Sequence, residues 1–79
     1  MEDKMKITEV YEVIDILKQF GIYIYTGHRY SDYILIQMEL EELYKSGVIP
    51  QRTYLESMVV MNRNIAKLKN KSDVQEKFL

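Results

Sequence analysis

Apolar side chains in this sequence recur every three or four residues within three segments, roughly 8–20, 31–46 and 50–69. This spacing keeps the apolar side chains of each segment on one face of an α-helix. A single amphipathic helix of this length is only marginally stable in water, so the three apolar faces must be buried against one another. The sequence therefore predicts an all-α fold, a small three-helix bundle.

Each predicted helix combines an apolar stripe with signals for its ends. Thr8 is expected to cap the first helix through its hydroxyl, and Gly21 to end it in a left-handed conformation. Ser31 or Asp32 is expected to cap the second helix, which would end before Gly47. The three stripes consist of Val10, Val13, Ile14, Leu17 and Phe20; of Tyr33, Ile36, Leu40 and Leu43; and of Tyr54, Met58, Met61, Ile65 and Leu68.

The start of the third helix has two interpretations. Pro50 suits the first helical turn, where its missing N–H leaves no donor unpaired. Thr53 and Glu56 match a capping box, which would start the helix three residues later. The sequence does not decide between these two starts.

The chain has 79 residues and no cysteine. The missing cysteines exclude a disulfide scaffold, a cysteine-ligated zinc site and a thiol nucleophile. No apolar run is long enough to span a membrane, and the opening residues MEDKMKITEV lack the apolar stretch of a secretory signal. We therefore expect a cytoplasmic protein with one domain at 1–79, a core at about 8–69 and a frayed tail at 70–79.

The connection between the first two helices is expected to be an extended loop. Ile22, Tyr23, Ile24 and Tyr25 alternate between aliphatic and aromatic side chains, as in an extended segment. A lone strand has no partner for its backbone hydrogen bonds, so this stretch is expected to pack across the bundle. Two of its four side chains would then face inward.

The charged residues are nearly balanced overall and separated along the chain. Eleven basic and twelve acidic residues give a net charge of −1, which argues against a protein that coats nucleic acid generally. The segment 32–42 contains acidic residues and no basic residue, and the segment 63–71 contains basic residues and no acidic residue. Two solvated helix faces of opposite sign are the simplest interpretation.

No residue pattern predicts catalysis, a cofactor or a metal site. His28 is the single histidine, and no nucleophile and orienting group accompany it in a triad pattern. Glu39 and Glu42 share a helix face and could at most hold Mg²⁺ weakly, so a solvated face is the simpler interpretation. We therefore expect a protein that is not an enzyme and that binds no cofactor.

Tyrosine is the most unusual component, with seven residues in 79 and no tryptophan. Tyr33, Tyr44 and Tyr54 are expected to fill the edge of the core. Aromatic rings beside a cation can stack on unpaired bases and hold a phosphate. The predicted loop site consists of Tyr23, Tyr25, Thr26, His28, Arg29 and Tyr30.

A basic stripe on the third helix could extend this site. Arg63 and Lys67 lie one helical turn apart and could contact phosphates without sequence preference. Arg52 and Lys71 are expected on the same outer face, where Glu56 interrupts the stripe.

Surplus apolar residues lie off the main stripes. Ile34, Leu35 and Met38 are expected to point away from the core of the second helix, and Val59 and Val60 flank the third stripe. Exposed apolar patches commonly mark interfaces. A protein partner or a homo-oligomer at this patch is therefore the alternative function.

The run Gly21-x-Tyr-Ile-Tyr-Thr-Gly27-x-Arg29, then Asp32, then Met-Glu-x-Glu-x-Leu-Tyr at 38–44 and Ile49, resembles the YqgQ-like family of small bacterial proteins. The resemblance covers about residues 8–68. It implies a compact three-helix bundle, no established catalytic residues and a role in binding single-stranded nucleic acid. This sequence has His28 where the resemblance implies an acid, and the tail at 70–79 extends beyond the resemblance.

These observations lead to one main hypothesis, a non-catalytic module that binds single-stranded RNA or DNA. Arg29 would contact phosphate, Tyr23, Tyr25 and Tyr30 would stack on bases, and Arg63 and Lys67 would extend the basic track.

Overall fold

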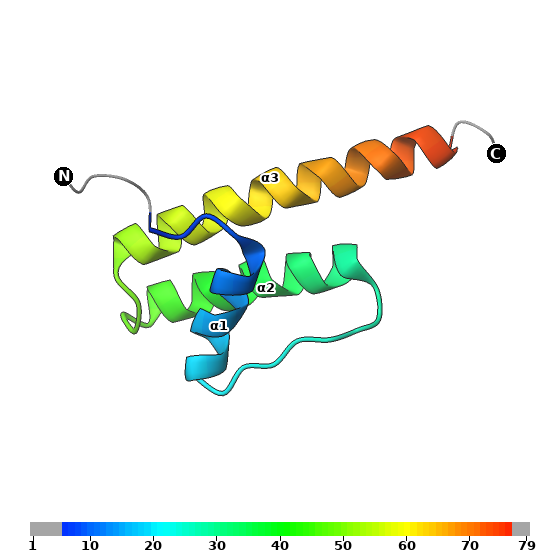
Figure 1. Cartoon of the computed structure of the whole chain (residues 1–79). Helices are drawn as coiled ribbons and strands as arrows, with labels where there is room; N and C mark the ends of the chain where they lie inside the picture. The colour runs from blue at the N-terminus through cyan, green and yellow to red at the C-terminus, as the bar shows by residue number, and fades with distance from the viewer. Residues whose placement is uncertain (1–5, 77–79) are drawn as a thin grey trace.

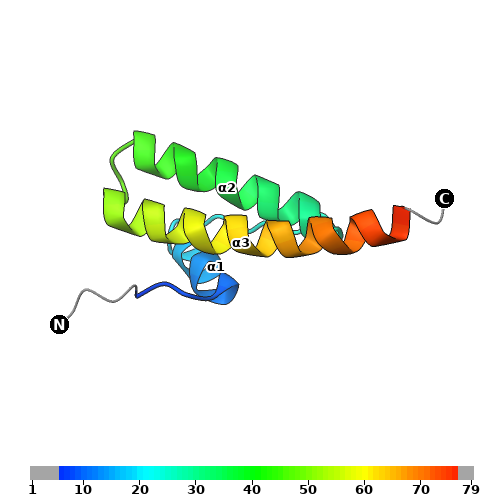
Figure 2. The same ribbon diagram turned by 90° about the horizontal axis from the view of Figure 1, so that it is seen from above.

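The structure of the protein is a computed structural model that describes the backbone of residues 6–76 and the side chains of residues 6–70. It contains helices α1 (Val10–Gln19), α2 (Arg29–Lys45) and α3 (Gln51–Glu76), and the described residues include no strand. Figures 1 and 2 show α2 and α3 side by side and antiparallel, with α1 crossing one side of the pair. The all-α three-helix fold expected from the apolar spacing is confirmed.

Two glycines end the first two helices in the same way. Gly21 and Gly47 have φ angles of 77° and 80°, a left-handed conformation that strains any other residue. After α1, the N–H of Ile22 donates to the carbonyl of Leu17 at 3.0 Å, and the N–H of Val48 repeats this pattern after α2. These bonds form Schellman caps, so the predicted helix end at Gly21 is confirmed.

The predicted start of α1 at Thr8 is wrong, because Glu9 holds the capping position. The Glu12 carboxylate accepts the backbone N–H groups of Thr8 and Glu9 at 2.8 and 2.9 Å. These two bonds, that from Thr8 most strongly, lower the pKa of Glu12, and burial opposes them. The Glu12 carboxylate thus forms the reciprocal part of a capping box, in which a side chain of the first turn accepts the N–H of the capping residue.

Helix α2 starts earlier than predicted, at Arg29, with His28 as its capping residue. Asp32 does not cap the helix, because its carboxylate is hydrogen-bonded to the preceding loop. Helix α3 starts directly after Pro50 and continues to Glu76, since no glycine or proline interrupts it. The expected frayed tail therefore begins within a helix, and residues 77–79 lie outside the described residues.

The core lies where all three helices meet. It consists of Val13, Leu17, Ile36, Leu40, Ile49, Val60, Met61 and Ile65. Val60 was expected to flank the core, but it is fully buried because α3 contacts both α1 and α2 and buries a wide arc. Phe20 was expected in the core, but it is 40% exposed at the end of α1. The rings of Tyr44 and Tyr54 stack at 4.5 Å across the α2–α3 pair, close to the turn.

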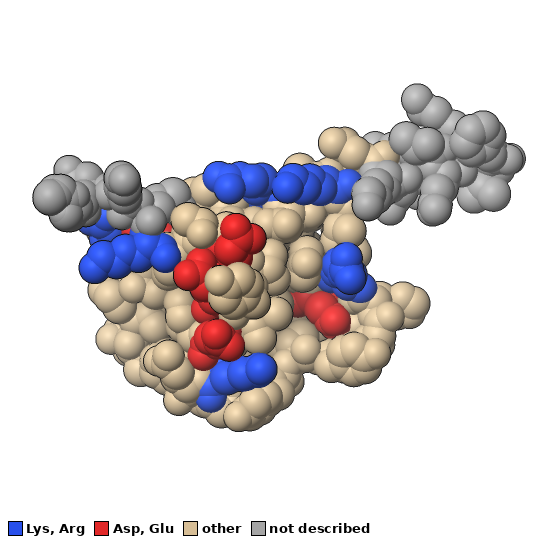
Figure 3. Space-filling model, viewed as in Figure 1, with Lys and Arg blue, Asp and Glu red and all other residues tan. Residues whose placement is uncertain are grey.

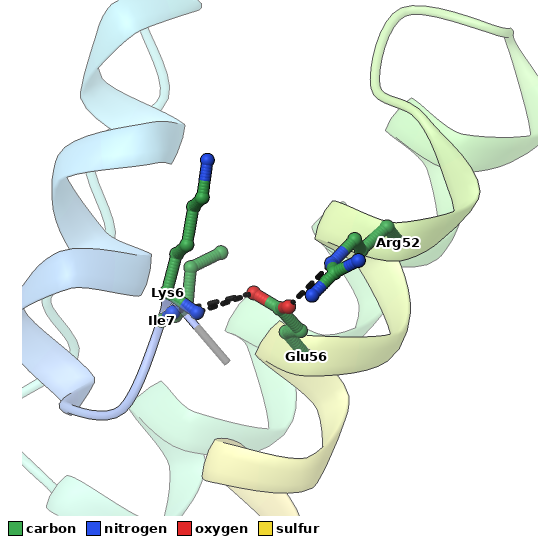
Figure 4. A network of polar contacts seen from close by, with 4 residues as sticks. All are labelled: Lys6, Ile7, Arg52 and Glu56. Carbon is green, nitrogen blue, oxygen red and sulfur yellow. Dashed lines mark hydrogen bonds and ion pairs between the residues drawn. The ribbon is translucent and has the colours of Figure 1, made fainter. Parts of the chain in front are cut away.

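Glu56 joins the N-terminal segment to α3 (Figure 4). Its carboxylate accepts the backbone N–H groups of Lys6 and Ile7 at 3.3 and 3.2 Å and pairs with Arg52 at 2.9 Å. The Arg52 hydrogen bond most strongly lowers the pKa of Glu56; burial opposes it, and the two backbone N–H groups act with it. Glu56 is buried, so the expectation that it interrupts an exposed basic stripe is wrong.

Candidate nucleic-acid interface

The loop between α1 and α2 separates its aliphatic side chains from its aromatic ones. Ile22 and Ile24 are half-buried and pack against the core. Tyr23 and Tyr25 are 72% and 88% exposed. The expectation that two of these four residues face inward is confirmed, and the two tyrosine rings are left accessible to a ligand.

Thr26 fixes the end of this loop on α2. Its backbone N–H and its hydroxyl both lie 2.7 Å from the same carboxylate oxygen of Asp32. The Thr26 Oγ also lies 3.2 Å from the backbone N–H and from the carbonyl of His28. Thr26 therefore acts as a structural link that holds the loop, and these contacts occupy the groups with which it could bind a ligand.

Two adjoining hollows of about 370 and 600 Å³ form a crevice between the C-terminal half of α3, the start of α2 and the loop. Arg29, Tyr33 and Leu68 line both hollows and so lie where they join. The hollow on the α3 side is completed by Asn64, Lys67 and Asn70. The hollow on the loop side also reaches α1 and is completed by Val10, Ile14, Ile24, Tyr25, Gly27, Asp32 and Ile36.

The two ends of the crevice differ in charge. On the α3 side, Arg29 and Lys67 line the wall, and no carboxylate among the described side chains does. On the loop side, Asp32 lies near Arg29, and Tyr25 supplies an exposed ring. Figure 3 shows basic side chains along α3 and at the start of α2, on either side of this opening. An anionic group is therefore favoured at the α3 side, and a flat aromatic group at the loop side.

A comparison with known protein families identifies the family of this chain. The family described as YqgQ-like matches residues 7–67. The chain belongs to the YqgQ-like family. No curated protein and no solved structure compared with the chain gave a match.

Three predicted site residues of this YqgQ-like chain lie together in the crevice, namely Tyr25, Arg29 and Lys67. Tyr23 lines a neighbouring hollow of about 330 Å³ with Ile14 and Ile22.

The remaining predicted residues line neither hollow of the crevice. Tyr30 is 46% exposed, His28 is exposed as the capping residue of α2, and Arg63 is exposed one turn before Lys67. Arg52 pairs with Glu56 near the start of α3, so it does not extend the basic wall. The side chain of Lys71 lies outside the described residues.

Sequence reasoning missed the polar wall on α3. Asn64 and Asn70 line the crevice, and Tyr33 forms part of its wall as well as the edge of the core. The amide nitrogen of Asn64 donates to the carbonyl of Val60 at 2.8 Å, which leaves the amide oxygen to accept from a ligand. The spacing of three residues between Asn64 and Lys67 placed both on one helix face and was the available signal.

A second hollow of about 600 Å³ lies under the N-terminal segment and differs from the α3 side of the crevice because a carboxylate lines it. Its walls include Ile16, Phe20, Val48 and Ile49; its cations are Lys6 and Arg52, and Arg52 is paired with the Glu56 carboxylate. Among the described residues, no three acidic or histidine side chains are grouped to hold a metal ion. No helix in the described part of the chain has the length and apolarity needed to cross a membrane.

Proposed function

We propose that this protein binds single-stranded nucleic acid in the crevice, without catalysing a reaction on it. The observation that carries the proposal is the meeting of Arg29 and Lys67 at an end that no described carboxylate lines, next to the exposed Tyr25 ring. Phosphates attract Arg and Lys, and unpaired bases stack on aromatic rings. A duplex keeps its bases stacked inside, so the crevice suits a single strand better.

The charge distribution supports different positions for the phosphate and the base of a nucleotide. Arg29 and Lys67 receive a phosphate on the α3 side, where Asn64 offers a free amide oxygen to a sugar hydroxyl or a base. Tyr25 receives a base on the loop side, because the Asp32 carboxylate there repels phosphate. Two adjoining hollows of about 370 and 600 Å³ are each large enough for a small ligand.

The test is a fluorescence-anisotropy titration of labelled single-stranded RNA, single-stranded DNA and duplex DNA with matched variants. Tyr25→Ala is compared with Tyr11→Ala, because Tyr11 is also well exposed but lies on α1 outside the crevice. Lys67→Ala is compared with Lys45→Ala, whose lysine is 64% exposed and pairs with Glu41.

The proposal has a distinct expected pattern. Tyr25→Ala weakens binding by about fivefold to 100-fold through lost base stacking, and Tyr11→Ala leaves it unchanged. Lys67→Ala lowers the slope of log affinity against log salt by about 0.7 to 1, and Lys45→Ala does not. Equal effects of the crevice variants and their controls, or no binding by the wild type, would overturn the proposal.

A further inference from the structure

The positive charge of the crevice is concentrated at one point. Arg29 is the first residue of α2, and it lines the hollow on the α3 side together with Lys67. Both residues are exposed, and neither forms an ion pair with a described residue. No described carboxylate lines this hollow. Two positive charges are therefore available there to a single anionic group.

The loop side of the crevice offers a position for one base and little attraction for a phosphate. Tyr25 supplies an exposed ring on this side. Arg29 is the one lysine or arginine among the described residues that line it, and the Asp32 carboxylate lines it as well. One oxygen of that carboxylate accepts the N–H and the hydroxyl of Thr26, both at 2.7 Å, and these bonds hold it in place. The positive charge thus does not continue along the loop side.

The positive charge does not continue along α3 within the crevice either. A groove that follows the interior of a single strand carries positive charge along its length. Arg63 lies one turn before Lys67 but lines neither hollow, and Arg52 is paired with Glu56. Beyond Lys67, the described wall ends at the uncharged Asn70. The described part of the crevice therefore has one phosphate position beside one base position.

We propose that the crevice binds a phosphate monoester that carries a single nucleoside, at the end of a nucleic-acid strand or in a free mononucleotide. This inference rests on the proposed function, because it states which phosphate of a nucleic acid the crevice holds. A phosphodiester within a strand joins two nucleosides and carries one negative charge. A monoester carries one nucleoside, about 1.5 to 2 negative charges at neutral pH and three terminal oxygens. The monoester thus matches two cations beside one exposed aromatic ring.

The test is isothermal titration calorimetry with unlabelled ligands at one salt concentration. Short single strands of one sequence carry a 5′-phosphate, a 3′-phosphate or no terminal phosphate, and a nucleoside 5′-monophosphate is compared with its nucleoside. A phosphate at one end is expected to strengthen binding of the strand by about fivefold to tenfold through its charge-assisted hydrogen bonds. The mononucleotide is expected to bind more tightly than the nucleoside for the same reason.

Matched variants locate this effect in the crevice. Lys67→Ala is expected to remove most of the advantage of the phosphorylated ligands, because one of the two cations is lost. Lys45→Ala is expected to retain the advantage, because Lys45 pairs with Glu41 and does not line the crevice. An advantage that Lys67→Ala and Lys45→Ala both retain would overturn the inference.

The ligands separate this inference from the proposed function. If the three strands bind equally and the mononucleotide binds no better than its nucleoside, the inference is wrong and single-strand binding stands. If the mononucleotide binds and no strand does, the monoester site is confirmed and the proposed function fails. If neither the strands nor the mononucleotide bind, both proposals are wrong.

Discussion

Val59 and Val60 are consecutive residues of α3 that allow the burial of the core to be measured directly. Val60 is 0% exposed, and Val59 is 44% exposed. Both are changed to alanine, so the two variants gain the same helix propensity, about 0.5 kcal/mol. The difference between them therefore reports burial alone.

The expected costs follow from the apolar groups removed. In Val60→Ala, two buried methyl groups lose about 1.6 kcal/mol of transfer free energy. An incompletely relaxed cavity adds about 1 kcal/mol. After the propensity gain, the free energy of unfolding falls by about 2 kcal/mol, which lowers the Tm by about 8–15 °C in a domain of this size. Val59→Ala loses about half of the transfer contribution and no cavity contribution, a net change under about 0.5 kcal/mol.

Urea unfolding followed by far-ultraviolet circular dichroism measures both variants. Equal costs for the two variants, or a larger cost at Val59, would refute the described orientation of α3 against α1 and α2.

Three further predictions concern the glycine cap of α1, the fall of the Tm at acidic pH and a buried hydroxyl in the core. Gly21→Ala is expected to lower stability by about 1 kcal/mol in urea unfolding, because φ of 77° strains an alanine; a neutral effect would contradict the left-handed cap. In Glu56→Gln, the Tm is expected to fall less steeply as the pH is lowered. The pKa of Glu56 in the folded protein lies below its ordinary value of 4.5. The stabilisation that Glu56 provides is therefore present above pH 4.5 and is lost as the pH falls through the lower value. An unchanged dependence of the Tm on acidic pH would contradict the contacts of Glu56 with Arg52, Ile7 and Lys6. Ser57→Ala is expected to raise stability by about 1 kcal/mol, because the hydroxyl is fully buried and finds no hydrogen-bond partner among the described residues; a destabilised variant would argue for a missing partner.

The helices themselves could be predicted because their signals are local. The apolar spacing located all three helices, and Gly21 and Gly47 marked two of their ends. The start of α2 was missed because Asp32, an apparent capping residue, is bound by Thr26 six residues earlier. Such a choice between two hydrogen-bonding roles depends on the path of the loop, which composition does not specify.

The role of Glu56 lay beyond sequence reasoning for a different reason. Its backbone partners, Lys6 and Ile7, are about 50 residues away in the chain, and only the packed bundle brings them together. Glu56 matched a local capping box with Thr53, and a contact made only in the folded bundle replaced this local interaction. The burial of Val60 was missed for a similar reason, because the spacing of apolar residues along one helix does not show how many other helices contact it.

Only part of the candidate site could be predicted from the sequence. Its loop residues could be chosen from the mixture of tyrosine and arginine alone. Arg29 and Lys67 lie together because the C-terminal half of α3 is beside the start of α2, which the sequence does not specify. Asn64 and Asn70 were missed because they are uncharged. The sequence therefore identified the chemistry of the site and only part of its walls.

The most direct test of the crevice is a nuclear magnetic resonance titration of the isotope-labelled protein with a short single-stranded oligonucleotide. The account predicts that amide shifts concentrate at Tyr25, Arg29 and Lys67, with smaller changes at Tyr11 and Leu55, which lie outside the crevice. Shifts that concentrate outside the crevice, or a spectrum that does not change at high oligonucleotide concentration, would contradict it.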